Sequence, residues 1–161
     1  MSALLLVCGE GGHYAQMMRL VKHVGIDASG FDLIVLSDSP RCVVLGTSPL
    51  VVQPVRNKEK TSFVGKLMTT LHGVSAQLGI CFNLVLRKKV RVMLSTGPGL
   101  AILPALFIRM MGGTVIHVET WSRFSTRSLT GIFMYWLSSR FYVQNKELGN
   151  LYRKAIYAGR L

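Results

Sequence analysis

Acidic residues are scarce in this 161-residue chain, and the resulting imbalance of charge is informative. Seven Asp and Glu residues stand against 19 Lys and Arg residues, which gives a formal net charge of +12, and half of all residues are hydrophobic. A basic surface attracts nucleic acid or anionic lipid headgroups. The large apolar fraction favours lipid, because membrane docking uses charge and apolar burial together. We therefore expect an anionic membrane surface as a partner and no nucleic acid.

Cysteine is also sparse. Cys8, Cys42 and Cys81 are an odd number without paired spacing, a pattern typical of reduced, buried thiols in a cytosolic protein. The N-terminus has neither a basic region nor a small-residue cleavage site, and its apolar run is too short for a signal segment. We expect a protein that is not exported.

Several motifs of catalytic chemistry are missing. The four histidines, among them His13 and His117, lack the spacing of metal ligands, and there is no Cys-x-x-Cys. There is no nucleophile elbow and no phosphate-binding Gly-x-x-x-x-Gly-Lys. We expect no metal and no cofactor. What remains is group transfer by positioning and proton abstraction, with His13 or Glu119 as the base.

The chain begins with an apolar run, residues 4–8, without polar alternation. Such a run indicates a strand covered on both faces, as in parallel sheets flanked by helices. The glycine-rich turn 9–12 follows, whose amides can approach an anionic or sugar-phosphate group at the start of the next helix. His13 falls at the mouth of that helix. The dinucleotide pattern Gly-x-Gly-x-x-Gly is incomplete, because Tyr14 occupies the place of the last glycine.

The order of strand, turn and helix recurs along the chain. Further strands are predicted at residues 31–37, 43–45, 50–55, 90–95, 114–118, 141–144 and 155–157, and helices at 15–24, 67–86, 100–111, 129–137 and 146–152. Pro104 predicts a kink near residues 101–103. This alternation predicts a doubly wound, mostly parallel α/β sheet in one domain over residues 1–161, with ligands at the carboxyl ends of the strands.

Residues 67–86 contain no charged side chain and have the length of a bilayer span. Their polar residues are too many for hydrocarbon, and two glycines weaken a helix. Two interpretations remain open. The segment is either a helix lying partly in the headgroup layer and closed by the basic run 87–91, or a core helix with a solvated basic end.

Each candidate residue also has a purely structural interpretation. His13 can cap a helix, and Glu119 can be an ion-pair partner of one of the many cations. His117 lies within a predicted strand and is expected to be a satisfied core or edge histidine and not a catalyst. Arg123 and Arg127 can hold a pyrophosphate or contact lipid headgroups. Spacing alone decides none of these alternatives.

Four groups of residues in a fixed order carry a family resemblance. They are Gly11-Gly12-His13 after the first strand, Ser95-Thr96-Gly97-Pro98-Gly99 after a middle strand, Val118 to Arg123 followed by Ser128 to Gly131, and Phe141 to Gln144 continuing to Ala158 to Leu161. On these motifs the sequence resembles oligosaccharide-biosynthesis glycosyltransferase subunits of the PssD type. Those subunits are bacterial relatives of the membrane-anchoring subunit of the dolichol-pathway UDP-GlcNAc transferase.

The resemblance implies a GT-B glycosyltransferase divided between two polypeptides, in which this chain is the Rossmann-like N-terminal half. This half would dock on the cytoplasmic face of the bacterial inner membrane and take an undecaprenyl-diphosphate-linked acceptor. A separate donor-binding subunit would bind the nucleotide sugar. A hexose would be transferred for capsule, exopolysaccharide or O-antigen synthesis. Eukaryotic members carry an N-terminal transmembrane helix, whereas here anchoring is expected to rest on residues 67–91 and 100–109.

The resemblance also implies roles for particular residues. His13 is expected near the acceptor hydroxyl as base or orienting group, and Glu119 is the second candidate. The expected substrate-binding residues are Gly11, Gly12, Thr96, Gly97, Pro98, Gly99, Arg123 and Arg127, and the expected partner-binding residues are Tyr157, Gly159, Arg160 and Leu161. Two rival functions remain open, a non-catalytic scaffold that activates the partner and a basic nucleic-acid-binding domain. The basic run lacks interleaved stacking aromatics, which argues against the second.

Overall fold

The computed structural model describes residues 3–30, 32–52 and 77–161. Seven strands form one sheet in the order β3-β2-β1-β4-β5-β6-β7, and every neighbouring pair is parallel. The strands are β1 (Ala3–Val7), β2 (Asp32–Ser37), β3 (Leu50–Val51), β4 (Val90–Ser95), β5 (Thr114–Val118), β6 (Arg140–Val143) and β7 (Ile156–Tyr157). The predicted parallel sheet is confirmed.

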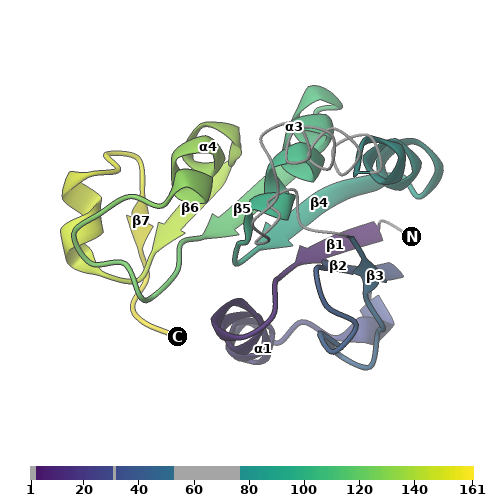
Figure 1. Ribbon diagram of the computed structural model, residues 1–161, viewed down its shortest axis with the longest axis horizontal. Coiled ribbons are helices and arrows are strands. Elements are labelled where there is room, and N and C mark those ends of the chain that lie inside the picture. Colours follow the sequence, from purple (N-terminus) through teal and green to yellow (C-terminus); the bar gives the residue numbers. More distant parts are fainter. Residues whose placement is uncertain (1–2, 31, 53–76) are drawn as a thin grey trace, which may run out of the picture.

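Helices cover both faces of this sheet, so the doubly wound prediction is also confirmed. In Figure 1, α1 (Gly12–Val24) lies below the sheet, whereas α3 (Ile102–Met110) and α4 (Leu129–Leu137) lie above it. A helical segment at residues 77–82, continued by the π-helical turn η2 (Asn83–Arg87), lies on the side of α3 and α4. The short 3-10 turns are η1 (Ala28–Gly30), η3 (Gly99–Ala101) and η4 (Lys146–Asn150).

The central strand β1 is buried along its whole length, as its unbroken apolar sequence predicts. Successive side chains of a strand point to opposite faces. Leu4 and Leu6 therefore enter the core under α1, while Leu5 and Val7 enter the core under α3 and α4. One strand thus contributes side chains to both hydrophobic layers, and its carboxyl end lies between them.

Helix α1 begins three residues earlier than its apolar pattern predicts, at Gly12 instead of Ala15. Gly11 has a φ of 76°, a left-handed conformation that lets the chain turn directly from the strand into the helix. Met17 and Val21 are buried against the sheet, and Gly25 ends the helix with a φ of 68°.

The kink expected near residues 101–103 is replaced by a change of helix type. The chain forms the 3-10 turn η3 and then begins α3 at Ile102. Pro104 consequently lies in the first turn of α3, where a backbone N–H has no partner within the helix. Its missing donor costs nothing there, so no distortion of the helix follows.

The expected strand at residues 43–45 is wrong. Val44 forms only an isolated antiparallel bridge with Thr47, because Leu45 (φ 49°) and Gly46 (φ 76°) both take left-handed conformations that turn the chain back. The helix expected at residues 146–152 is only the 3-10 turn η4. The parts of the predictions that fall on residues 53–76 lie outside the described residues.

The three cysteines are free and buried, as expected. Burial raises the pKa of the Cys8 and Cys81 thiols to about 12. A thiol with so high a pKa is not a nucleophile at neutral pH. In the described ranges, no helix is both long and apolar enough to cross a bilayer.

Candidate functional site

The loops that leave β1, β4 and β5 meet at the carboxyl edge of the sheet, because these three strands are neighbours and run in one direction. In parallel α/β sheets this edge is where ligands bind. It carries the turn 9–13 after β1, the turn 96–99 after β4 and the segment 119–128 after β5.

His13 is held by two hydrogen bonds to the turn after β4. Its Nδ1 lies 2.6 Å from the carbonyl oxygen of Thr96, and the Thr96 hydroxyl donates to the carbonyl oxygen of His13 at 2.9 Å. A carbonyl only accepts hydrogen bonds, so Nδ1 carries a proton, and in the neutral imidazole the lone pair is on Nε2. The half-buried ring thus presents a proton acceptor at the edge of the sheet.

Two glycines make this close approach of the turns possible. A Cβ on Gly97, whose φ is 93°, would lie 2.6 Å from Cε1 of His13, and a Cβ on Gly9 would lie 2.8 Å from Cγ of Pro98. Both distances are well below van der Waals contact. Asp38, at the end of β2, completes the turn by accepting from the backbone N–H of Glu10 at 2.9 Å.

Glu119 lies at the end of β5, and its carboxylate points into the protein with only 2% of the residue exposed. Its oxygens accept hydrogen bonds from the Thr120 N–H at 3.0 Å, the Ser128 hydroxyl at 3.1 Å and the Tyr152 hydroxyl at 3.3 Å. Ser128 in turn caps α4 by accepting from the Gly131 N–H at 2.7 Å. The carboxylate therefore fixes both ends of the segment 120–128.

Glycine is required at position 131 by this arrangement. A Cβ there would lie 1.8 Å from Oε2 of Glu119 and 2.6 Å from the Tyr152 hydroxyl. Burial and the adjacent Glu119 raise the pKa of Tyr152, so its hydroxyl stays a hydrogen-bond donor. The predicted catalytic role of Glu119 stays a prediction, and the geometry favours a positioning role.

Arg123 and Arg127 stand on the exposed segment after Glu119. Arg127 donates to the carbonyl oxygen of Leu151, and its guanidinium lies 5.2 Å from the centre of the Tyr152 ring. Arg123 donates to the Thr126 hydroxyl at 3.1 Å. The guanidinium of Arg127 is thus occupied by contacts within the protein. The Arg123 guanidinium donates to an exposed hydroxyl, so it is the better placed of the two for a phosphate.

The remaining predicted substrate-binding residues divide into two groups. Gly11 and Gly12 are exposed, and nothing lies within 4 Å of a Cβ built on either, so they form an open rim beside His13. Thr96 is buried and Gly97 lies under the His13 ring. The structure therefore brings the first and second glycine turns together around His13, and it leaves Glu119 turned away from them.

His117 lies in β5 with 2% of its surface exposed, and its ring packs against Phe141 with the ring centres 5.4 Å apart. Its Nδ1 has no hydrogen-bond partner. Burial, and secondarily the nearby His13, lowers the pKa of His117 to about 3. His117 is a core histidine, as expected, but the expectation that its ring is satisfied is wrong for Nδ1. The ring is neutral at physiological pH.

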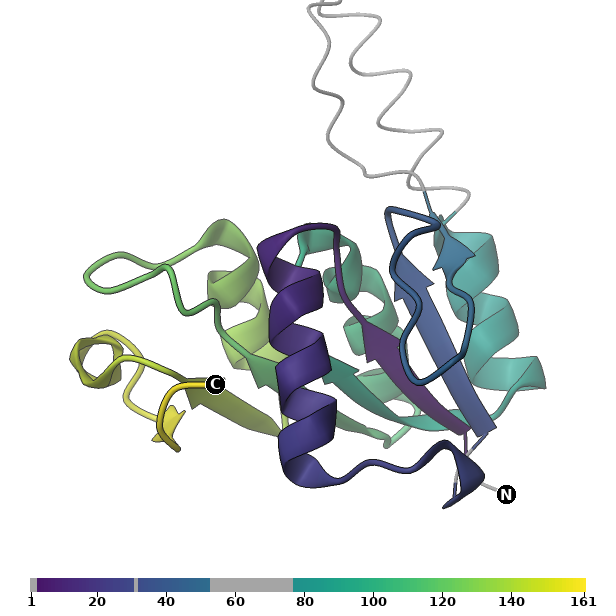
Figure 2. The ribbon, with the colours of Figure 1, turned by 90° about the horizontal axis from the view of Figure 1, so that it is seen from below.

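A second feature is an apolar groove of about 990 Å³ on the α1 face of the sheet. In Figure 2 the C-terminus lies beside α1. The groove is lined by β1, β4, β5 and β6, by the second half of α1 and by the C-terminal tail; its apolar residues include Val92, Leu94, Ile116, Val118, Tyr142 and Leu161. Of these sheet residues, Val92, Ile116 and Tyr142 are half-buried, whereas Leu94 and Val118 are buried.

The predicted partner-binding residues lie at this groove or next to it. Gly159, Arg160 and Leu161 line it, and Tyr157 is half exposed on β7 with Lys146 Nζ 5.6 Å from its ring centre. The tail is held by Arg19, which donates to the Leu161 carbonyl oxygen at 3.2 Å while its guanidinium lies 4.8 Å from the centre of the Trp121 ring.

Three polar residues that support the site, buried Gln16 and Gln144 and half-buried Ser128, were not among the predicted site residues. Gln16 on α1 donates to the carbonyl oxygens of Val118 and Glu119, each at 3.3 Å. Gln144 donates to the same Glu119 oxygen at 2.9 Å and accepts from the Leu161 N–H at 3.0 Å. Ser128 was detectable as a serine directly before an apolar helix, and Gln16 as a polar residue on the apolar face of α1.

The class of protein follows from these features and from two solved structures. MurG of Acinetobacter baumannii matches 89% of this chain with a TM-score of 0.53 and 15% identity, and the UDP-GlcNAc 2-epimerase of Methanocaldococcus jannaschii matches 98% with a TM-score of 0.62 and 14% identity. The chain spans 41% and 45% of the length of these two proteins. Its fold is the Rossmann-like half of a GT-B protein.

The particular family is shown by sequence. Residues 4–161 match the model of the family described as "Oligosaccharide biosynthesis protein Alg14 like", and the chain belongs to this family. Relatives named "UDP-N-acetylglucosamine transferase subunit ALG14" are 28% identical in Rattus norvegicus and 27% identical in Homo sapiens. These alignments cover 98% and 99% of this chain, and 82% of each relative.

Proposed function

We propose that this chain is the acceptor- and membrane-binding subunit of a two-component glycosyltransferase. With a separate donor-binding subunit, it transfers a hexose from a nucleotide sugar to an undecaprenyl-diphosphate-linked saccharide at the cytoplasmic face of the bacterial inner membrane. The product serves capsule, exopolysaccharide or O-antigen synthesis. The names of the ALG14 relatives make UDP-N-acetylglucosamine the first donor to test.

The observation that carries this proposal is the hydrogen bond between His13 Nδ1 and the Thr96 carbonyl oxygen. It fixes the ring and leaves Nε2 free to accept the proton of an acceptor hydroxyl as that oxygen forms a bond to the anomeric carbon of the donor sugar. The nucleoside diphosphate leaves with the electron pair of the broken bond. His117, uncharged beneath the site, does not compete for this proton.

The other predicted residues have supporting parts in this proposal. The exposed rim of Gly11 and Gly12 and the turn 96–99 border the acceptor hydroxyl, and Arg123 faces the diphosphate of the lipid carrier. Glu119 acts as a positioning residue, because its carboxylate fixes the segment that carries Arg123. The apolar groove and the tail from Tyr157 to Leu161 hold the donor-binding subunit, which covers the accessible part of the sheet.

The test is sugar transfer to a synthetic prenyl-diphosphate-sugar acceptor, with this chain alone, with a donor-binding subunit encoded beside it alone, and with both together. We expect turnover only in the mixture. His13→Ala should then lower kcat by about 100-fold or more, the usual contribution of a general base. The control is Asp32→Ala, because Asp32 is exposed at the amino end of β2 and does not line the groove.

Two outcomes would contradict the proposal in different ways. Turnover by the mixture that is unchanged in His13→Ala would make this chain a non-catalytic scaffold. Equal turnover by the donor-binding subunit alone would remove this chain from the reaction. Glu119→Gln should lower kcat by less than His13→Ala, because an amide keeps an oxygen that can accept from Ser128.

A further inference from the structure

The outer surface of the α3/α4 layer is apolar, although this layer also covers a core on its inner side. Inner residues such as Leu84, Ile108 and Met134 are buried. The outward side chains are also large and apolar: Leu78, Phe82 and Leu86 at residues 77–87, Leu106 and Met110 on α3 with Met111 after it, and Leu129, Ile132, Phe133 and Trp136 on α4. Helices that are apolar on both sides are expected to be buried on both sides.

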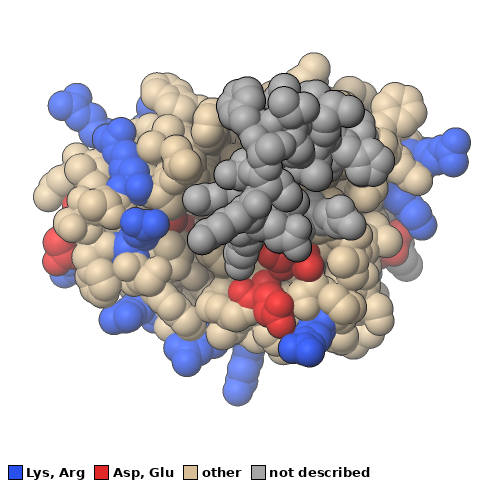
Figure 3. All heavy atoms as spheres, viewed as in Figure 1, with Lys and Arg blue, Asp and Glu red and all other residues tan. Residues whose placement is uncertain are grey.

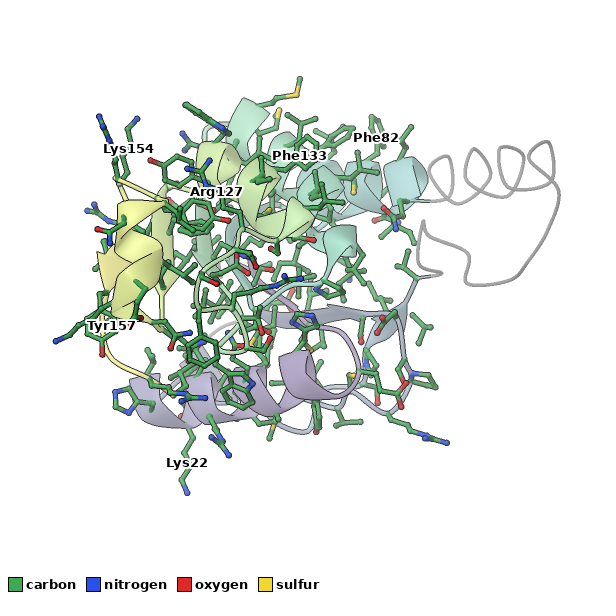
Figure 4. The ribbon with its side chains drawn as sticks, turned by 60° about the vertical axis from the view of Figure 1, so that its left-hand side comes forward. Lys22, Phe82, Arg127, Phe133, Lys154 and Tyr157 are labelled. Atoms are coloured by element: carbon green, nitrogen blue, oxygen red, sulfur yellow. The ribbon has the colours of Figure 1, made fainter. Side chains whose placement is uncertain are left out.

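The exposure of these outward side chains is high. Leu129 and Trp136 are each 75% exposed, Met110 is 73%, Phe82 56% and Phe133 54%. In Figure 4, Phe82 and Phe133 both extend from the same side of the molecule, opposite Lys22 on α1. Contiguous apolar surface of this kind is rare on soluble monomers and indicates a binding surface. We call the ten outward residues the outer apolar face.

The charge around the outer apolar face selects the kind of partner. Between residues 77 and 146 the only acidic residue is Glu119, which is buried. The basic residues of the same stretch are Arg87, Lys88, Lys89, Arg91, Arg109, Arg123, Arg127, Arg140 and Lys146. Lys154 adds a cation whose Nζ lies 5.9 Å from the centre of the Trp136 ring. Lys and Arg side chains project around much of the outline in Figure 3, and Asp and Glu are few.

An anionic bilayer is the partner that matches both properties. Apolar side chains enter the boundary between headgroups and acyl chains, and the surrounding Lys and Arg side chains contact anionic headgroups. Trp136 beside Lys154 is the kind of pair that sits at headgroup depth. A protein partner would need acidic residues of its own to face these cations.

We propose that the outer apolar face docks this chain on an anionic bilayer, with α3, α4 and residues 77–87 lying against the membrane surface. The proposal deepens the proposed function and rests on it in one respect, the lipid-borne acceptor. Both α3 and α4 begin at the carboxyl edge of the sheet, so Leu129 brings the docked surface next to the segment that begins at Glu119. The site then opens beside the headgroups, where a lipid-linked diphosphate lies.

The first experiment measures co-sedimentation of the full chain with vesicles. We expect binding to phosphatidylglycerol and phosphatidylethanolamine vesicles and at least tenfold weaker binding to phosphatidylcholine vesicles. The double variant Leu129→Ser with Trp136→Ser should weaken binding to the anionic vesicles by about tenfold or more, because two large apolar side chains are lost. The control Val43→Ser with Val51→Ser changes exposed valines elsewhere and should leave binding unchanged. Equal binding by both double variants would overturn the proposal.

The second experiment uses the two tryptophans of the chain and vesicles of brominated anionic lipid. Bromine quenches a tryptophan that enters the bilayer. Trp136→Phe should abolish the quenching, and Trp121→Phe should retain it, since Trp121 lies under Arg19 near α1. Quenching that is lost in Trp121→Phe would overturn the proposal. It would also be overturned if the chain self-associates and the double variant Leu129→Ser with Trp136→Ser does not, because the face would then be an interface between copies of the chain.

Failure of this proposal can be told apart from failure of the proposed function. Transfer to a water-soluble short-prenyl acceptor without vesicles depends on His13 and not on docking. Suppose that the chain is active with this acceptor and that the double variant Leu129→Ser with Trp136→Ser binds vesicles as tightly as wild type. The docking proposal alone would then be wrong. Vesicle binding through Trp136 without any transfer would overturn the proposed function alone.

Discussion

The two faces of the sheet differ in which apolar surface they leave accessible. On the α1 face the strands β4, β5 and β6 leave an apolar groove, so what is accessible is the sheet itself. On the α3/α4 face the sheet is covered, and what is accessible is the outside of the cover. A partner on the first face must fit the grooved surface of a sheet, which a folded protein can do. A partner on the second needs only to accept apolar side chains among cations, which a bilayer does.

This difference would allow one small domain to hold both proposed partners at once. The groove and the outer apolar face lie on opposite sides of the sheet, so occupation of one does not block the other. The edge that carries His13 lies between them. A subunit that must bring a membrane-borne acceptor to a donor held by another protein requires this arrangement.

The largest expected effect concerns how α4 is attached to the sheet. Gly131→Ala places a Cβ within 1.8 Å of the buried Glu119 carboxylate, so the cap and the segment 120–128 must move. We expect a loss of about 3 kcal/mol or more in the free energy of unfolding, as for overpacked cores. Denaturant unfolding measures it.

The matched control for this change is Gly99→Ala. The nearest atom to a Cβ at that position is the Thr130 hydroxyl oxygen at 3.6 Å, an ordinary contact. We expect a change below about 1 kcal/mol. Similar losses in the two variants would show that Glu119 does not hold α4 in the way described.

The second prediction separates the two faces directly. Ile116 is a half-buried residue of β5 that lines the groove. Ile116→Glu should weaken association with the donor-binding subunit by at least about 100-fold, or about 2.7 kcal/mol, because a charge would be buried in an apolar contact. Vesicle binding should not change. Leu106→Glu, on the outer apolar face of α3, should weaken vesicle binding and leave association with the donor-binding subunit unchanged. Loss of both activities in both variants would contradict the separation of the faces.

The third prediction uses pH. His117 packs in the core under α3 and α4 with a pKa of about 3, against 6.5 for an ordinary histidine. Below pH 6.5 the unfolded chain therefore binds a proton that the folded chain does not. The free energy of unfolding then decreases as the pH is lowered, by up to about 1.4 kcal/mol per pH unit. His117→Gln should reduce the slope of unfolding free energy between pH 6 and pH 5 by about 1 kcal/mol per unit.

His23→Gln is the control for the pH experiment, because His23 is exposed and its loss should leave the slope unchanged. Hydrogen exchange should show that acid loosens α3 and α4 before α1. Equal slopes in wild type and His117→Gln would mean that the carboxylates alone account for the acid response.

Much of the fold was predictable because the strands are short apolar runs bounded by turn residues. The runs at 90–95, 114–118 and 129–137 were placed with the bounds that the structure has. Residues 43–45 failed for a specific reason. Their apolar pattern is that of a strand, but Leu45 accepts a left-handed conformation beside Gly46, which no apolar pattern reveals.

The candidate site was only partly predictable. The glycine turns and His13 could be found because local sequence fixes a turn. The hydrogen bond from His13 to Thr96 joins residues 83 positions apart, and the burial of Glu119 depends on Ser128 and Tyr152, which come from other elements. Anchoring was expected from residues 67–91 and 100–109, of which 67–76 lie outside the described residues, and this role stays a prediction. The apolar outer side of α4 was not expected, because an apolar helix looks the same in sequence whichever side faces the core.

The smallest expected effect tests whether the C-terminal tail belongs to the partner surface. Arg19 joins α1 to the tail through the Leu161 carbonyl oxygen and contacts Trp121. Arg19→Met keeps the apolar stem but loses the hydrogen bond and the cation–π contact, so we expect association with the donor-binding subunit to weaken by about fivefold, or about 1 kcal/mol. Lys88→Met removes an exposed charge that does not line the groove and should change the association by less than twofold. Titration calorimetry distinguishes the two, and equal effects would mean that net charge, and not a positioned tail, strengthens the association.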